Sequence, residues 1–99
     1  MLSTNEAQRL IVEECDAVRT LLLAKNREYG NSALDPVGVF SRLDAVAQIE
    51  VRIDDKLKRL QTTRRMSDGE VQIHEDTEQD LIGYLILLRV ARRAARGRE

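Results

Sequence analysis

The chain has 99 residues, of which 42% are hydrophobic and 33% are charged, a composition typical of one domain with large solvated faces. The 16 Lys and Arg nearly balance the 17 Asp and Glu, so the net charge of −1 excludes a strong overall attraction to nucleic acid. Cys15 is the single cysteine, which excludes an intrachain disulfide and a zinc site built from cysteines.

The first predicted helix covers about residues 4–27. Ser3 followed by Glu6 is a capping signature for its start. Apolar side chains then recur at helical spacing: Ala7, Leu10, Ile11, Val18, Leu21 and Leu22. The following stretch, "KNREYGNSALDPVG", contains glycine, asparagine and proline and predicts a loop that is suited to face a ligand.

The second predicted helix covers about residues 40–61, and Ser41 with Asp44 in "SRLD" is its capping signal. At about 100° per residue, Glu50 projects inside the apolar stripe of this helix. Asp54 lies at the edge of that stripe, whereas Asp55 lies on the opposite side. The stripe consists of Leu43, Val46, Ile49, Ile53, Leu57 and Leu60.

The third predicted helix covers about residues 72–96. Between Leu81 and Ala91 it is apolar nearly all the way round, apart from Gly83 and Arg89. A helix of this kind is central in a bundle or enclosed by a second subunit. The three predicted helices indicate an all-α fold, one small helical domain over residues 1–99. Because so short a chain cannot easily surround the third helix, we expect homo-oligomerisation, as a dimer or tetramer, to complete the fold.

Two further features concern location and partners. No apolar run reaches the roughly 18 residues of a membrane span and no signal peptide is visible, so we expect a cytoplasmic protein without a membrane partner. The arginine-rich tail is interpreted as a solvated last turn that complements the helix dipole. Nucleic-acid binding through this tail is a less favoured alternative. The tail arginines are Arg89, Arg92, Arg93, Arg96 and Arg98.

Acidic residues occur in two pairs with i, i+4 spacing, Glu50 with Asp54 and Asp76 with Asp80. This spacing places both carboxylates of a pair on one side of a helix. We expect these carboxylates to point inward, where each needs a counter-charge. Two interpretations stay open. The partners are protein cations in structural ion pairs, or a divalent cation such as Mg²⁺, which prefers hard oxygen ligands.

Three segments resemble a known family. "KNREYGNSA", "RIDDKLKRL" and "EDTEQDLIGYLILL" are similar to the phage-associated nucleotide modification associated domain, with its K-N-x-x-Y-G, D-K-x-x-R-L and D-x-x-x-D-L-x-x-Y elements. That family in turn resembles the MazG-like all-α nucleoside triphosphate pyrophosphatases. The resemblance spans about residues 25–88.

The resemblance implies a helical bundle that oligomerises around its active site and hydrolyses a nucleoside triphosphate to a monophosphate and pyrophosphate. It assigns Mg²⁺ to Glu50, Asp54, Asp76 and Asp80, with Asp55 as the alternative to Asp54. Glu50 is also the candidate to accept the proton of the attacking water. Candidate phosphate contacts are Lys25, Lys56 and Arg59, and Tyr29 is a candidate contact for the base or sugar.

Two alternatives to a nucleoside triphosphate pyrophosphatase stay open. A relative of these enzymes could bind the nucleotide without hydrolysing it. Alternatively, the chain is a non-enzymatic helical oligomeric interaction module whose acidic pairs are structural ion pairs. Such a module explains the apolar third helix as an oligomer interface and needs no substrate.

Overall fold

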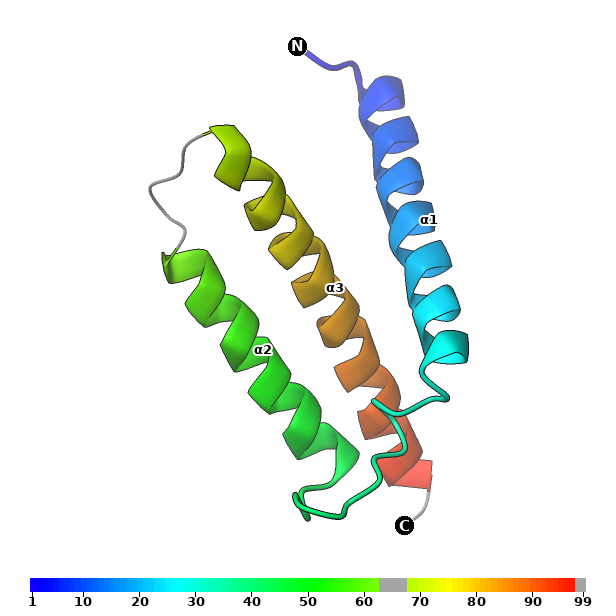
Figure 1. Ribbon diagram of the computed structural model, residues 1–99. Helices are drawn as coiled ribbons and strands as arrows, with labels where there is room; N and C mark the ends of the chain where they lie inside the picture. Colours follow the sequence, from blue (N-terminus) through cyan, green and yellow to red (C-terminus); the bar gives the residue numbers. More distant parts are fainter. Residues whose placement is uncertain (63–67, 98–99) are drawn as a thin grey trace. The chain divides into compact units, whose positions relative to one another are not determined.

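The computed structural model of the protein describes residues 1–62 and 68–97. It contains three helices, α1 (Thr4–Glu28), α2 (Ala45–Thr62) and α3 (Asp68–Gly97), and no strand within these residues (Figure 1). The prediction of an all-α protein is therefore confirmed. The chain forms two compact units, Met1–Gly30 with α1 and Asn31–Glu99 with α2 and α3. One domain over residues 1–99 stays a prediction.

The first helix begins where its capping signature predicts. The side-chain oxygen of Ser3 accepts a hydrogen bond of 3.1 Å from the backbone N–H of Glu6. The helix ends at Glu28, within one residue of the predicted end. Gly30 and Asn31 follow with φ angles of 59° and 62°, a left-handed conformation that glycine and asparagine adopt most readily.

The second helix begins later than the predicted start near residue 40. Asp44 caps it, because its Oδ1 accepts a hydrogen bond of 2.8 Å from the backbone N–H of Ala47. Ser41 instead accepts a 3.3 Å bond from the N–H of Leu43, within a turn that precedes the helix. The prediction that Ser41 caps this helix is wrong. The Asp44 carboxylate satisfies a free helical N–H and also interacts favourably with the helix dipole.

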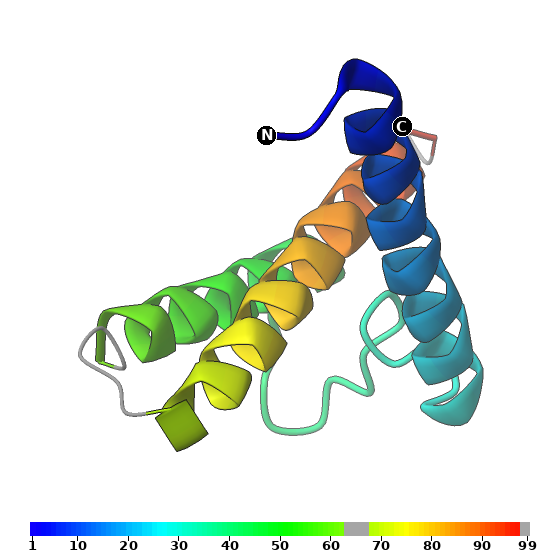
Figure 2. The same ribbon diagram turned by 90° about the horizontal axis from the view of Figure 1, so that it is seen from above.

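Helices α2 and α3 lie side by side and run in opposite directions, as Figures 1 and 2 both show. Among the side chains whose burial is described, Ile49 of α2 is the most buried hydrophobic one: it is 2% exposed and packs with Leu88 and Ala91 of α3. These three side chains are aliphatic, in keeping with a sequence of which only 3% is aromatic. Partly buried side chains pack around this centre: Leu34, Ala45, Val46, Ile53, Tyr84 and Leu87.

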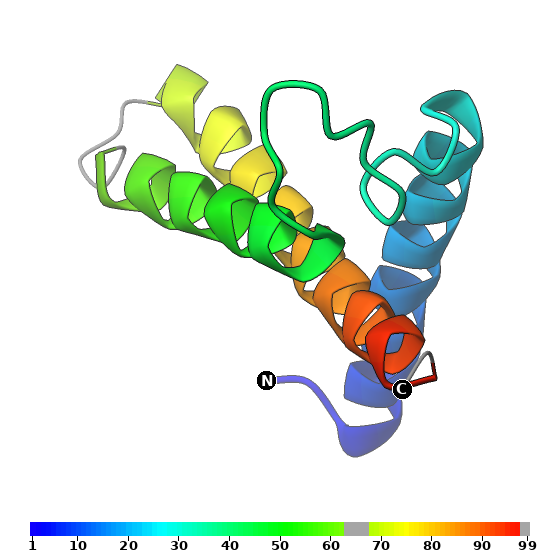
Figure 3. The ribbon, with the colours of Figure 1, turned by 90° about the horizontal axis from the view of Figure 1, so that it is seen from below.

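The segment that leads into α2 follows an irregular path (Figure 3). Leu34 packs against the core of the α2–α3 pair and attaches the segment to it. Gly38 has a φ of 71°, a turn conformation that suits glycine. Beside it, Val37, Val39 and Phe40 are exposed. The loop expected here is thus confirmed as a loop, and it displays apolar side chains.

The third helix extends from Asp68 to Gly97, slightly beyond the predicted range of 72–96 at both ends. Arg98 of the predicted tail lies outside the described residues. Among residues 1–62 and 68–97, no helix combines the length and the apolar character required to cross a membrane.

Replacing Asp44 by alanine should lower the free energy of unfolding by about 1 kcal/mol, because α2 loses its N-cap. Urea denaturation followed by circular dichroism measures this difference. Ser41→Ala is the matched control and should change the unfolding free energy much less. Equal losses for the two variants would contradict the assignment of Asp44 as the cap.

Candidate functional site

Lys56 joins the two helices of the second unit through polar contacts. Its Nζ lies 3.3 Å from Oδ2 of Asp80 and 5.9 Å from the centre of the Tyr84 ring. The Lys56 side chain is only 12% exposed, and that of Asp80 is 31% exposed. The ammonium group is therefore held between a carboxylate and an aromatic face, both of which come from α3.

The packing of the helices explains why these residues meet. Ile49 contacts α3 near Leu88, and the helices are antiparallel, so each turn forward along α2 corresponds to one turn back along α3. Two turns after Ile49, Lys56 reaches the level of Asp80 and Tyr84. Asp80 and Tyr84 are four residues apart and therefore share one side of α3.

Three of the four predicted metal ligands do not point into the core of one chain. Glu50, Asp54 and Asp76 are exposed, and only Asp80 is partly buried. The expectation of inward carboxylates is wrong for these three. The physical reason for Glu50 is that the edge of the stripe is itself open to water, since the neighbouring Leu57 is also exposed.

The two acid pairs also face different sides. At about 100° per residue, Glu50 lies about 120° and Asp54 about 160° around α2 from Lys56. Lys56 is the residue that holds Asp80. The carboxylates of α2 are therefore directed away from the side on which Asp80 meets α2. Asp55 is exposed as well, so exposure does not separate it from Asp54.

Among the described side chains, no group of three or more His, Cys, Asp or Glu is placed to hold a metal ion. One copy of the chain thus does not fit a Mg²⁺ site made of all four carboxylates. Each acid pair by itself still offers two carboxylates on one side of a helix. Magnesium binding by Glu50, Asp54, Asp76 and Asp80 stays a prediction.

The predicted phosphate and base contacts belong to two units. Lys56 and Arg59 are on α2, and at about 100° per residue they lie about 60° apart, on neighbouring sides of the helix. Lys25 and Tyr29 are at the end of α1, in the first unit. Lys25 is half-buried, whereas Tyr29 and Arg59 are exposed. Their roles in binding a nucleotide stay predictions.

Tyr84 is the site residue that the sequence analysis did not single out. Its i, i+4 spacing from Asp80 was visible in the sequence, and so was its position in the D-x-x-x-D-L-x-x-Y element. The sequence does not show the register between α2 and α3, and it is this register that brings Lys56 close to both Asp80 and Tyr84.

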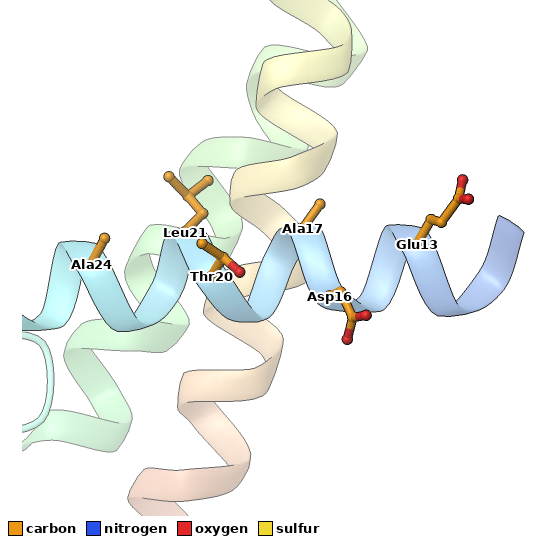
Figure 4. Close-up of a pocket in the computed structure, with 6 residues that line it drawn as sticks. All are labelled: Glu13, Asp16, Ala17, Thr20, Leu21 and Ala24. Carbon is orange, nitrogen blue, oxygen red and sulfur yellow. The ribbon is translucent and has the colours of Figure 1, made fainter. Parts of the chain in front are cut away.

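A hollow also lies on the surface of α1 (Figure 4). Its charged side chains are the carboxylates of Glu13 and Asp16, and no cation lines it, so it does not suit a phosphate group. None of the predicted site residues belongs to it. The hollow is lined by Glu13, Asp16, Ala17, Thr20, Leu21 and Ala24.

Comparison of the chain with protein-family models, with curated proteins and with solved structures gives no match. The site is therefore defined by its own geometry: a partly buried ion pair, a neighbouring tyrosine ring, and further acids on the helix surfaces.

Replacing Lys56 by methionine should lower the free energy of unfolding by about 1 kcal/mol, because the ion pair and the cation–π contact are lost while the apolar stem remains. Urea denaturation of the full chain measures this change. Lys58→Met is the control, since Lys58 is exposed on the same helix. If both variants were as stable as the original chain, the contacts of Lys56 would contribute nothing to the free energy of unfolding.

Proposed function

We propose that the protein is a Mg²⁺-dependent nucleoside triphosphate pyrophosphohydrolase, or a nucleotide-binding relative of such enzymes, linked to phage nucleotide metabolism. The proposal rests on the resemblance of "KNREYGNSA", "RIDDKLKRL" and "EDTEQDLIGYLILL" to the nucleotide modification associated domain and, through it, to MazG-like enzymes. It includes a MazG-like bundle that is completed by homo-oligomerisation.

One contact supports this proposal most directly. Lys56 belongs to the D-K-x-x-R-L element, and Asp80 and Tyr84 belong to the D-x-x-x-D-L-x-x-Y element. These two elements are far apart in the sequence, yet Lys56 contacts both residues of the second element. Contact between residues of two motifs is expected when both motifs belong to one site.

The proposed reaction is hydrolysis between the α- and β-phosphates, in which water attacks and pyrophosphate leaves. Phosphoryl transfer depends mainly on positioning and on charge neutralisation, so it needs no protein nucleophile. Lys25, Lys56 and Arg59 are the proposed phosphate contacts, and Tyr29 is the proposed contact to the base or sugar. Glu50, which is exposed to water, is proposed to accept the proton of the attacking water.

A second function is favoured by the ion pair itself. Asp80 already has a protein cation at 3.3 Å, and the described residues contain no metal-binding group. Both findings are expected of a non-enzymatic helical module in which the acids are structural partners. This module would oligomerise through its apolar surface and would bind neither magnesium nor nucleotide.

A thermal-shift series with nucleoside triphosphates, with and without Mg²⁺, separates the two functions. At about 100 times its dissociation constant, a bound nucleotide should stabilise the fold by about 2.7 kcal/mol. We expect this stabilisation to require Mg²⁺ and to disappear in Asp80→Asn. Pyrophosphate release from any stabilising nucleotide then distinguishes an enzyme from a binding protein.

Glu13→Gln on α1 is the control, because Glu13 is exposed and pairs only locally with Arg9 at 2.8 Å in the contacts described. Asp54→Asn and Asp55→Asn, compared side by side, identify which of these carboxylates takes part. If no nucleotide shifts the unfolding temperature of the original chain, the interaction module replaces the enzyme as the proposed function.

A further inference from the structure

Two roles of Lys56 compete for one ammonium group. Lys56 is the counter-ion of Asp80, with its Nζ 3.3 Å from Oδ2, and it is also a proposed contact for the phosphates of a nucleotide. Asp80 in turn is a predicted ligand of Mg²⁺. Lys56, Asp80 and the neighbouring Tyr84 all belong to the unit Asn31–Glu99, so these contacts are internal to that unit.

A divalent cation bound to Asp80 would come close to the ammonium group of Lys56. Mg²⁺ binds carboxylate oxygens at about 2.0–2.1 Å, and the ammonium group lies at 3.3 Å from the same carboxylate. Two cations on one carboxylate repel, and the repulsion is strong where water is scarce. Water screens it only in part, because the Lys56 side chain is 12% exposed and that of Asp80 is 31% exposed. Asp80 therefore favours one cation at a time.

The ring of Tyr84 gives the ammonium group a second partner. Its centre lies 5.9 Å from Nζ of Lys56, close to the outer limit of about 6 Å for a cation–π contact. A lysine side chain is a flexible four-carbon stem, so its ammonium group can move without a change in the helix. A movement away from Asp80 and toward the ring keeps the ammonium group beside the site.

We propose that Lys56 and a divalent cation are alternative partners of Asp80, so that Lys56 is a competitor for metal binding at α3. The inference rests on the proposed function, which supplies the divalent cation. Proteins commonly hold Mg²⁺ with one or two carboxylates together with substrate phosphates, and Asp80 with Asp76 can supply these carboxylates. When Asp80 has a divalent cation, the ammonium group of Lys56 is free for the phosphate contact, which reconciles its two roles.

Binding of Mn²⁺ to the full chain tests this competition without nucleotide. Mn²⁺ prefers the same oxygen ligands as Mg²⁺, and electron paramagnetic resonance measures the concentration of free Mn²⁺ during a titration. Lys56→Met should bind Mn²⁺ about tenfold more tightly than the original chain, because both the repelling charge and the ion pair are removed. Lys58→Met is the matched control. It removes the same charge from an exposed position on α2 and should bind Mn²⁺ like the original chain.

Two further variants assign the effect to charge and to Asp80. Lys56→Gln removes the charge but keeps a polar side chain, and it should give the same gain as Lys56→Met. Adding Asp80→Asn to Lys56→Met should abolish the gain, because the amide carries no negative charge. Circular dichroism of each variant checks that its helix content is that of the original chain.

Two results would overturn the proposal. Equal Mn²⁺ affinities of Lys56→Met and Lys58→Met, including no binding by either variant, would mean that Lys56 does not compete with a metal ion. A gain that survives Asp80→Asn would place the competition at another carboxylate.

These results are distinguishable from a failure of the proposed function. If a nucleotide with Mg²⁺ stabilises the original chain while the two lysine variants bind Mn²⁺ equally, only the competition is rejected. If Lys56→Met binds Mn²⁺ more tightly but no nucleotide stabilises the original chain, the competition stands and the proposed function is rejected.

Discussion

The contact of Ile49 with Leu88 and Ala91 fixes the register between α2 and α3, and the polar contacts of the second unit depend on that register. Once these apolar side chains interlock, the helical repeat leaves little freedom for the residues further along. Lys56 then meets Asp80 and Tyr84, and Glu50 and Asp54 are turned to another side. The hydrophobic core therefore decides which charged residues become partners, although none of those residues belongs to it.

The helices could be predicted well because their signals are local. Ser3 and Glu6 mark the start of α1 unambiguously, and the structure uses the same hydrogen bond. The start of α2 was harder to predict, since Ser41 and Asp44 are both good capping residues only three positions apart. The local sequence signal does not choose between them, and only the hydrogen bonds of the structure assign the cap to Asp44.

The candidate site could be predicted only in part for a related reason. Helical periodicity shows which residues share a side, and Asp80 and Tyr84 do share one. Periodicity does not show what covers that side. Glu50 lies beside Leu57 as the pattern predicts, but in one chain that edge of α2 is open to water. The same holds for the third helix. Its sequence is apolar nearly all the way round, and periodicity does not show that α2 covers only one of its faces.

The position of Tyr84 makes the α2–α3 pair observable by spectroscopy. The chain contains no tryptophan and two tyrosines, and Tyr29 is exposed whereas Tyr84 is partly buried beside Lys56. An aromatic ring in a fixed asymmetric environment produces a near-ultraviolet circular dichroism band, and a freely rotating ring produces very little. The near-ultraviolet spectrum of this protein therefore reports mainly on one ring. Loosening of the two helices would be visible there before their helical content changed.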